Sequence, residues 1–209
     1  MDKNIVKRNE LLARKLIKGL ESRNMNGYYA ADRGEALSVA LSLIPEGSTV
    51  TMGGGQSVWE IGLPDALKAG NYKFIDRNEY TDKRAAFLAA VDADVFLASA
   101  NAITDDGVMV NIDGNANRVA ALAYGPKKLV LIVGMNKVCP DIDAAMKRAR
   151  SVAATINARR FGLSTPCSKT GACMTCKSPD TICCQFLITR FSRAAGRVHV
   201  ILVNDNLGF

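Results

Sequence analysis

Residues 49–63 read TVTMGGGQSVWEIGL, and this segment describes a strand that runs directly into a helix. The residues from 48 to 52 favour a strand, Gly53–Gly55 form a turn without side chains, and residues from about Ser57 to Leu67 favour a helix. A strand followed by a helix is the repeating unit of a parallel sheet. The segment therefore predicts an α/β fold with a glycine-rich loop at one strand end.

The same alternation continues on both sides of this unit. Apolar positions at helical spacing predict a helix over residues 2–23, and Asp32 is placed to cap a second helix. Further strands are predicted at about residues 28–30, 72–75, 95–99, 108–112, 129–133, 185–189 and 198–203, and further helices at 81–91, 115–124 and 142–160. We therefore expect a mainly parallel sheet that is covered by helices on both faces.

Length and composition indicate one cytoplasmic domain, residues 1–209, with an N-terminal helix over 1–25. The N-terminus is charged and not of the secretory type, and no apolar run is long enough to cross a bilayer.

The charges are unevenly distributed along the sequence. Residues 1–126 carry 14 Lys and Arg against 16 Asp and Glu, whereas residues 127–209 carry 13 Lys and Arg against 4 Asp and Glu. The few aromatic residues are not interleaved with the basic ones, so we expect neither a nucleic-acid partner nor a membrane partner.

The glycine loop is a candidate binding site for an anion. Backbone amides at Gly53, Gly54 and Gly55 can approach a ligand closely because no Cβ atoms intervene, and Gln56 and Ser57 add side-chain donors. The loop has neither the Gly-Lys-Ser/Thr of a Walker loop nor the spacing of G-x-G-x-x-G. The alternative is a plain tight turn.

Two further groups of polar residues accompany the loop. Glu60 lies in the first turn of the helix, either as a catalytic carboxylate or as a residue matched to the helix dipole. Residues 98–137 place polar side chains at strand ends and turns, where ligands of open α/β sheets bind. The candidates are Asn101, Asp106, Asn111, Asp113, Asn117, Arg118 and Lys127. Several of them must be turn formers, because Asn and Asp bond their own backbone.

Four clustered cysteines form the other candidate site. Cys167, Cys173, Cys176 and Cys183 follow the spacing C-x5-C-x2-C-x6-C within residues 164–184. An all-sulfur set suits zinc or an iron–sulfur cluster, and the irregular spacing favours a 4Fe–4S cluster over zinc. Redox thiols and simple packing are the alternatives, and the participation of Cys139 or Cys184 stays open.

Several of these segments together resemble one family. They are MGGGQSVWEIGL (52–63), NAITDDGVMVNIDGNANRVAALAYGPKKLVLIVGMNKV (101–138), the cysteine-rich loop and GRVHVILVNDNLGF (196–209). They look like the lactate-utilisation (LUD) domain family, in particular its short stand-alone members with a C-terminal cysteine-rich segment. The resemblance implies a Rossmann-like α/β/α sandwich, similar to the ribose-5-phosphate isomerase, glucosamine-6-phosphate deaminase and CoA-transferase superfamily. It also implies a phosphosugar or acyl-CoA site at the glycine loop.

Three functional hypotheses follow. The first is a protein of lactate-type organic-acid metabolism that binds a small anionic or phosphorylated metabolite and passes electrons through its metal centre to redox partner subunits. The second is a phosphosugar isomerase or CoA-transferase-like enzyme with a structural zinc, in which Asp106 or Asp113 is the general base and Lys127 also belongs to the catalytic set. The third is a sensor or scaffold without catalysis. The N-terminal helix either packs on its own domain or pairs two subunits in a homodimer.

Overall fold

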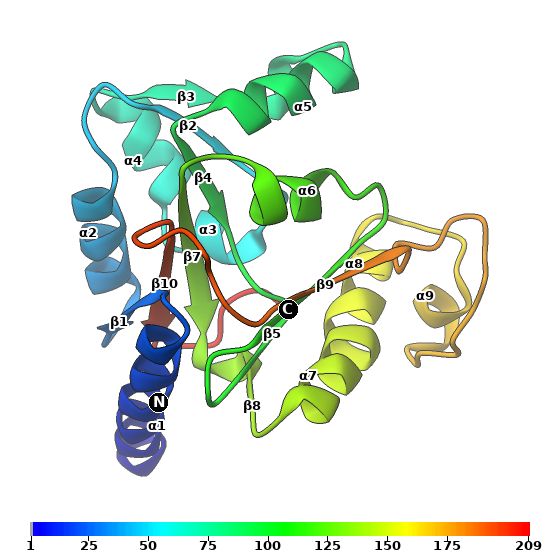
Figure 1. The fold of residues 1–209 in the computed structure, drawn as a ribbon. Coiled ribbons are helices and arrows are strands. Elements are labelled where there is room, and N and C mark those ends of the chain that lie inside the picture. The colour runs from blue at the N-terminus through cyan, green and yellow to red at the C-terminus, as the bar shows by residue number, and fades with distance from the viewer. Residues whose placement is uncertain (1) are drawn as a thin grey trace.

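The computed structural model describes residues 2–209, the side chain of Asn78 excepted, and its centre is a sheet of six parallel strands (Figure 1). The strand order is β1-β10-β7-β4-β2-β3. The bounds are β1 Asn26–Ala30, β2 Thr49–Met52, β3 Lys73–Ile75, β4 Val95–Ala98, β7 Lys128–Gly134 and β10 Val198–Val203. The predicted mainly parallel sheet is therefore confirmed.

Helices cover both faces of this sheet, as the apolar strands require. In β7 the side chains alternate: Leu129 and Leu131 join one core cluster, and Val130 and Ile132 join the other. The first face packs against α1 (Lys3–Ser22) and α6 (Asn117–Tyr124). The second face packs against α2 (Arg33–Leu43), α3 (Gln56–Glu60) and α4 (Leu63–Ala69). The fold is the expected α/β/α sandwich.

The helix after the glycine loop is interrupted, which the sequence did not predict. Gly62 has a φ of 74° and separates α3 from α4. A left-handed residue ends a helix at low cost only when it lacks a Cβ atom. The cap of α2 is as predicted, since the Asp32 side chain accepts a hydrogen bond from the Glu35 amide at 2.9 Å.

A second, four-stranded sheet was also not predicted. Its order is β8-β5-β6-β9, with β5 Ala102–Thr104, β6 Met109–Asp113, β8 Val138–Cys139 and β9 Gln185–Thr189. Residues 105–107 form the predicted hairpin turn between β5 and β6. Ala102 and Val110 of this sheet pack against Ala145 and Ala149 of the following helical segment.

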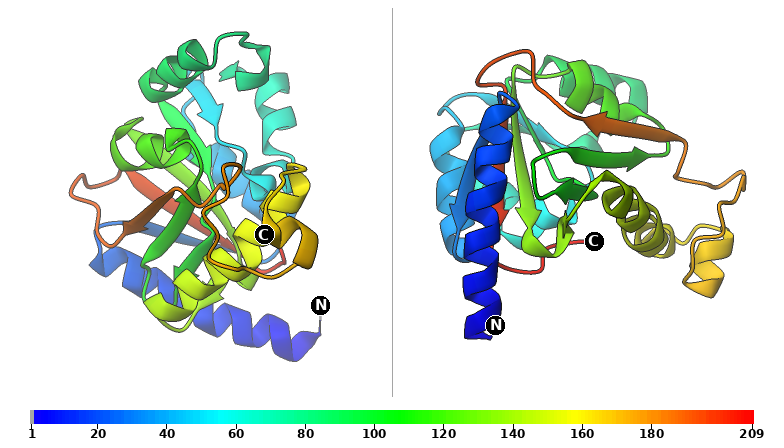
Figure 2. Two further views of the ribbon diagram at one scale, coloured as in Figure 1. Left: turned by 90° about the vertical axis from the view of Figure 1, so that its right-hand side faces the viewer. Right: turned by 60° about the horizontal axis from the view of Figure 1, so that its bottom comes forward.

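That helical segment spans residues 142–160 as predicted, but it contains a π-helical stretch. It consists of α7 (Ile142–Arg148), the π-helix Ala149–Ala154 and α8 (Thr155–Arg160). The cysteine-rich loop then leads from α8 to β9, and it stands at the edge of the molecule in Figures 1 and 2. The loop contains one short helix, α9 (Pro166–Thr170), with Pro166 in its first turn. Between β3 and β4 lies α5 (Lys83–Asp92).

Across residues 2–209, no helix combines the length and the apolar character that a membrane span requires.

Candidate functional site

A cavity of about 1140 Å³ opens at the carboxyl ends of β2 and β4. From β2 the chain continues to β3 on one side, whereas β4 pairs with β7 on the other side. The two strands therefore flank a topological switch point, which is where ligands bind in open α/β sheets. The helices α5, α6 and α8 close the cavity from the other directions.

The predicted glycine loop lines this cavity. A Cβ atom on Gly53 would lie 3.1 Å from the Arg118 side chain, and one on Gly54 would lie 3.2 Å from a guanidinium nitrogen of Arg77. The Gly53 amide donates to the Leu97 carbonyl at 3.1 Å. The amides of Gly54 and Gly55 have no acceptor among the described residues. The loop thus brings two arginines close and leaves two N–H donors available.

The cavity wall is strongly cationic. Its described residues include six basic side chains and one carboxylate, that of Asp113. The basic ones are Arg77, Lys83, Arg84, Arg118, Lys137 and Arg160. Arg118 pairs with Asp113, whereas none of the other five forms an ion pair with a described carboxylate. Uncompensated like charges around a concave site favour an anionic ligand.

Arg118 is held in place by residues that the sequence grouped with it. Its guanidinium donates to the Asn101 side chain at 3.1 Å and to the Ile112 carbonyl, and its backbone amide donates to Asp113 at 3.0 Å. Burial lowers the pKa of Arg118, and the carboxylate of Asp113 opposes that shift. The side chain is 17% exposed, so it is a fixed cation at the cavity wall. The predicted grouping of Asn101, Asp113 and Arg118 therefore comes together here.

Four other candidates lie at or beside the cavity. Gln56 lines it and accepts from Arg160 at 3.3 Å, and Asn117 also lines it. Ser57 and Glu60 lie behind the wall, where they bond the C-terminal segment: Ser57 donates to the Leu207 carbonyl at 3.2 Å, and Glu60 accepts from the Gly208 amide at 2.8 Å.

Asn111 is buried in β6 outside the cavity wall. Its side-chain oxygen has no hydrogen-bond partner among the described residues. A buried amide oxygen without a donor costs free energy. The structure therefore separates Asn111 from the other predicted ligand-binding residues.

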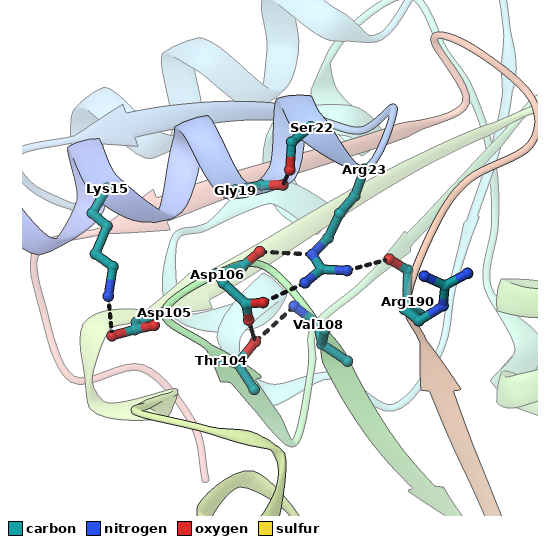
Figure 3. A network of polar contacts seen from close by, with 9 residues as sticks. All are labelled: Lys15, Gly19, Ser22, Arg23, Thr104, Asp105, Asp106, Val108 and Arg190. Atoms are coloured by element: carbon teal, nitrogen blue, oxygen red, sulfur yellow. Dashed lines mark hydrogen bonds and ion pairs between the residues drawn. The ribbon is translucent and has the colours of Figure 1, made fainter.

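Two of the three predicted catalytic residues lie away from the cavity. Asp106 is in the β5–β6 turn against α1, bonded to Arg23 and Thr104 (Figure 3). The hydrogen bond from Thr104 lowers the pKa of Asp106, partial burial opposes the shift, and Arg23 lowers the pKa further. Lys127 is exposed at the amino end of β7, opposite to the strand ends that form the cavity. Of the three, Asp113 alone lines the cavity.

Lys137 is the residue that sequence reasoning passed over. Its side chain is almost fully buried at the cavity floor and donates to Ser57 Oγ at 2.8 Å and Ser99 Oγ at 2.9 Å. Burial lowers the pKa of Lys137 to about 7, Arg148 lowers it further and Glu60 opposes the shift. A lysine three residues after an apolar strand was the available signal, because that strand end meets the ligand edge of the sheet.

The four predicted metal-ligating cysteines are half-buried free thiols. Burial raises the pKa of Cys183, a hydrogen bond with Thr181 opposes this, and the charges of Cys173, Cys167 and Cys176 raise it again. The sulfurs of Cys173, Cys167 and Cys176 are thus near enough to that of Cys183 for their charges to act on it. Within residues 2–209, however, no three His, Cys, Asp or Glu side chains stand in a metal-binding arrangement. The donor set fits a thiophilic metal, whereas the arrangement of the side chains is not that of a metal-bound site.

The cysteine-rich loop also touches the cavity. Ile182, next to Cys183, lines the cavity wall, and a Cβ atom on Gly114 would lie 3.2 Å from the Ile182 Cα atom. A change in the conformation of the loop would therefore reach the cavity through Ile182.

Comparison with known proteins agrees with this fold. The LUD domain model matches residues 13–203, so the chain belongs to the LUD domain family. The crystal structure of a DUF162 family protein from Deinococcus radiodurans is similar, with a TM-score of 0.53 and 12% sequence identity over 93% of this chain and 98% of that chain. At this identity the likeness concerns the fold alone. A search of curated proteins finds no significant match.

Proposed function

We propose that this LUD-domain protein serves lactate-type organic-acid metabolism in the cytoplasm by binding a small anionic or phosphorylated metabolite in the cavity. The observation that carries the proposal is the wall itself, where the described residues include four arginines and Lys83, besides the buried Lys137, but only one acidic side chain. Membership of the LUD family agrees with lactate utilisation at a coarse level.

The charges around the cavity support an anionic ligand. Burial lowers the pKa of Arg160, and the nearby charge of Arg77 lowers it further. Clustered guanidinium groups repel one another, and a bound anion would remove that repulsion. Arg118 is already oriented by Asn101 and Ile112, so little conformational entropy is lost when it contacts a ligand. The free amides of Gly54 and Gly55 provide neutral donors beside these cations.

The size of the cavity extends the argument to phosphorylated compounds. At about 1140 Å³ the cavity exceeds what a three-carbon acid would fill. Basic residues also come from several elements: Arg77 and Arg118 lie beside the glycine loop, Arg84 belongs to α5 and Arg160 to α8. A ligand with two separated anionic groups would use this arrangement best.

Arg160 and its neighbour Arg159 give a matched test of this proposal. Arg160 lines the cavity and donates to the Gly54 carbonyl at 3.3 Å, whereas Arg159 does not line it. We expect Arg160→Gln to weaken the binding of inorganic pyrophosphate by about tenfold, since one charge-assisted contact is lost. Arg159→Gln should change it by less than about twofold, because exposed distant charges are screened. Isothermal titration at low salt measures both, and equal losses in the two variants would contradict the assignment.

The cysteine-rich loop is proposed to hold a metal centre, a 4Fe–4S cluster in preference to zinc, that exchanges electrons with partner subunits. Support comes from the all-sulfur donor set and from the nearness of the other three thiols to Cys183, whose pKa their charges raise. Cys167, Cys173, Cys176 and Cys183 would be the ligands. A cluster there would supply one-electron transfer next to the cavity.

The metal and acid-labile sulfide content of anaerobically purified protein tests the proposed metal centre. We expect about four iron and four sulfide per chain. Cys176→Ser should lose most of both, and Cys139→Ala should keep them, because Cys139 is buried within strand β8 of the second sheet. About one zinc per chain without sulfide would assign a structural role instead. Protein that holds neither metal would refute the metal site.

A further inference from the structure

Three polar side chains, those of Lys137, Ser57 and Ser99, meet at the floor of the cavity. Lys137 Nζ donates to Ser57 Oγ at 2.8 Å and to Ser99 Oγ at 2.9 Å, and the two hydroxyl oxygens lie 3.4 Å apart. All three side chains are buried, with exposures of 2%, 0% and 5% for Lys137, Ser57 and Ser99. Placing an amine here costs free energy, because burial disfavours its charged form.

The three residues differ in their access to a ligand. Ser99 and Lys137 line the cavity, whereas Ser57 lies behind them and donates to the Leu207 carbonyl. Ser99 directly follows β4, at the switch point between β2 and β4. A ligand in the cavity would therefore meet the hydroxyl of Ser99 with the amine of Lys137 next to it.

The surroundings of Lys137 favour its neutral form. Burial lowers the pKa of this amine to about 7, and the charges of Arg148 on α7 and Arg118 on α6 add to the shift. Glu60 on α3 opposes them, but without cancelling the effect of burial. A lysine that loses its proton near neutral pH can act as a general base for a hydroxyl group.

The glycine loop completes the arrangement. A Cβ atom on Gly55 would lie 3.7 Å from the Ser99 backbone nitrogen, so the loop and Ser99 are neighbours. The amides of Gly54 and Gly55 have no acceptor among the described residues. Backbone N–H groups beside a nucleophile stabilise the oxyanion that forms during acyl transfer.

We propose that Ser99 is the nucleophile and Lys137 its general base in acyl transfer from an ester or thioester that carries a negative charge. The negative charge rests on the proposed function, because the cationic wall would hold it. Ser57 is the positioning residue, since its hydroxyl accepts from Lys137 and approaches Ser99.

The reaction proceeds in two balanced halves. Ser99 Oγ bonds to the carbonyl carbon while Lys137 takes the hydroxyl proton, and the amides of the glycine loop, where Gly55 neighbours Ser99, would stabilise the oxyanion. The bond to the alcohol or thiol then breaks, and Lys137 returns the proton to that leaving group. A water molecule next attacks the acyl carbon while Lys137 takes its proton. The bond between that carbon and Ser99 Oγ then breaks, Lys137 returns the proton to Ser99 Oγ, and a carboxylic acid is released.

A fluorophosphonate probe tests the proposal on the intact chain, because serine attack displaces fluoride and leaves a stable phosphorus–oxygen bond. We expect one label, located on Ser99 by peptide mass spectrometry, and none on Ser99→Ala. Lys137→Met should label at least about a hundredfold more slowly. The exposed Lys147→Met should label at the wild-type rate. The wild-type rate should rise with pH through about 7, since the neutral amine is the active form.

Two results would overturn the proposal: a wild-type chain that takes no label at Ser99, and a folded Lys137→Met variant that labels at the wild-type rate. Circular dichroism checks that the variants fold. Inorganic pyrophosphate distinguishes a failure of the proposed anion site from a failure of the proposed nucleophile. If it slows labelling of Ser99, the anion site and the nucleophile share one cavity. Labelling of Ser99 without pyrophosphate binding would refute the proposed anion site but support Ser99 as the nucleophile. Pyrophosphate binding without labelling would support the anion site but refute Ser99 as the nucleophile.

Discussion

Replacing Lys137 with methionine is expected to stabilise the protein near neutral pH and to stabilise it much less in alkaline solution. The folded chain holds Lys137 with a pKa of about 7, below its ordinary value of 10.5. Between these two values the unfolded chain binds the proton and the folded chain does not, so the stability of the wild type rises with pH. Below about pH 7 the free-energy penalty of burying the charged amine is complete. It decreases as the pH rises toward the pKa of this lysine in the unfolded chain.

The size of this effect follows from the shift. Each pH unit within the window is worth at most about 1.4 kcal/mol of unfolding free energy. We expect the advantage of Lys137→Met over the wild type to fall by more than about 1 kcal/mol between about pH 7 and pH 9. The substitution leaves the serine hydroxyls with acceptors, the carbonyls of Leu207 for Ser57 and Ala100 for Ser99. Urea unfolding at both pH values measures the difference.

The exposed Lys147→Met is the control for this prediction. Its side chain is exposed on α7, so we do not expect this variant to reproduce the change seen with Lys137→Met. A pH-independent difference for Lys137→Met would show that the folded protein does not perturb this lysine. That result would also remove the general base from the proposed acyl-transfer site.

Replacing Gly19 with alanine is expected to destabilise the fold by about 2 kcal/mol. A Cβ atom on Gly19 would overlap the backbone of Asp106, 2.6 Å from its carbonyl carbon. Figure 3 shows why the two segments cannot simply separate: Lys15 pairs with Asp105 at 2.6 Å, and Arg23 pairs with Asp106. The cost of the overlap exceeds the gain of up to about 1 kcal/mol that alanine brings to a helix.

Gly34→Ala on α2 is the matched control. A Cβ atom there would meet only the capping oxygen of Asp32, at 3.3 Å, and a small shift of that side chain would relieve the contact. We expect this variant to be neutral or slightly more stable, by the helix propensity of alanine. Thermal unfolding of both variants gives the comparison. A Gly19→Ala protein as stable as the wild type would mean that α1 does not pack on the β5–β6 turn.

The glycine loop and its strand could be predicted from the sequence because their signals are local. Apolar residues before Gly53 and helix-forming residues after Gly55 define the unit without any tertiary information. The same holds for Asp32 as a cap and for the turn at residues 105–107. The parallel sheet follows from the alternation of strands and helices.

The other features of the fold and of the site depend on contacts between residues that are far apart in the sequence. Asp106 and Asp113 look alike in the sequence, yet Asp106 turns toward α1 and Asp113 toward the cavity. The second sheet escaped prediction because the exposed strand β9 carries no signal for the strand with which it pairs. Arg160 reaches the site from a helix that lies about a hundred residues after the glycine loop, as its bond to Gln56 shows. Such long-range contacts have no periodic signature.

The most direct test of the anion site is isothermal titration of the wild-type protein with inorganic pyrophosphate at two salt concentrations. We expect saturable binding at one site, with an affinity that falls as salt rises because the contacts are electrostatic. Pyrophosphate that produces no saturable heat at low salt, in protein shown to be folded, would contradict the anionic ligand and the function built on it.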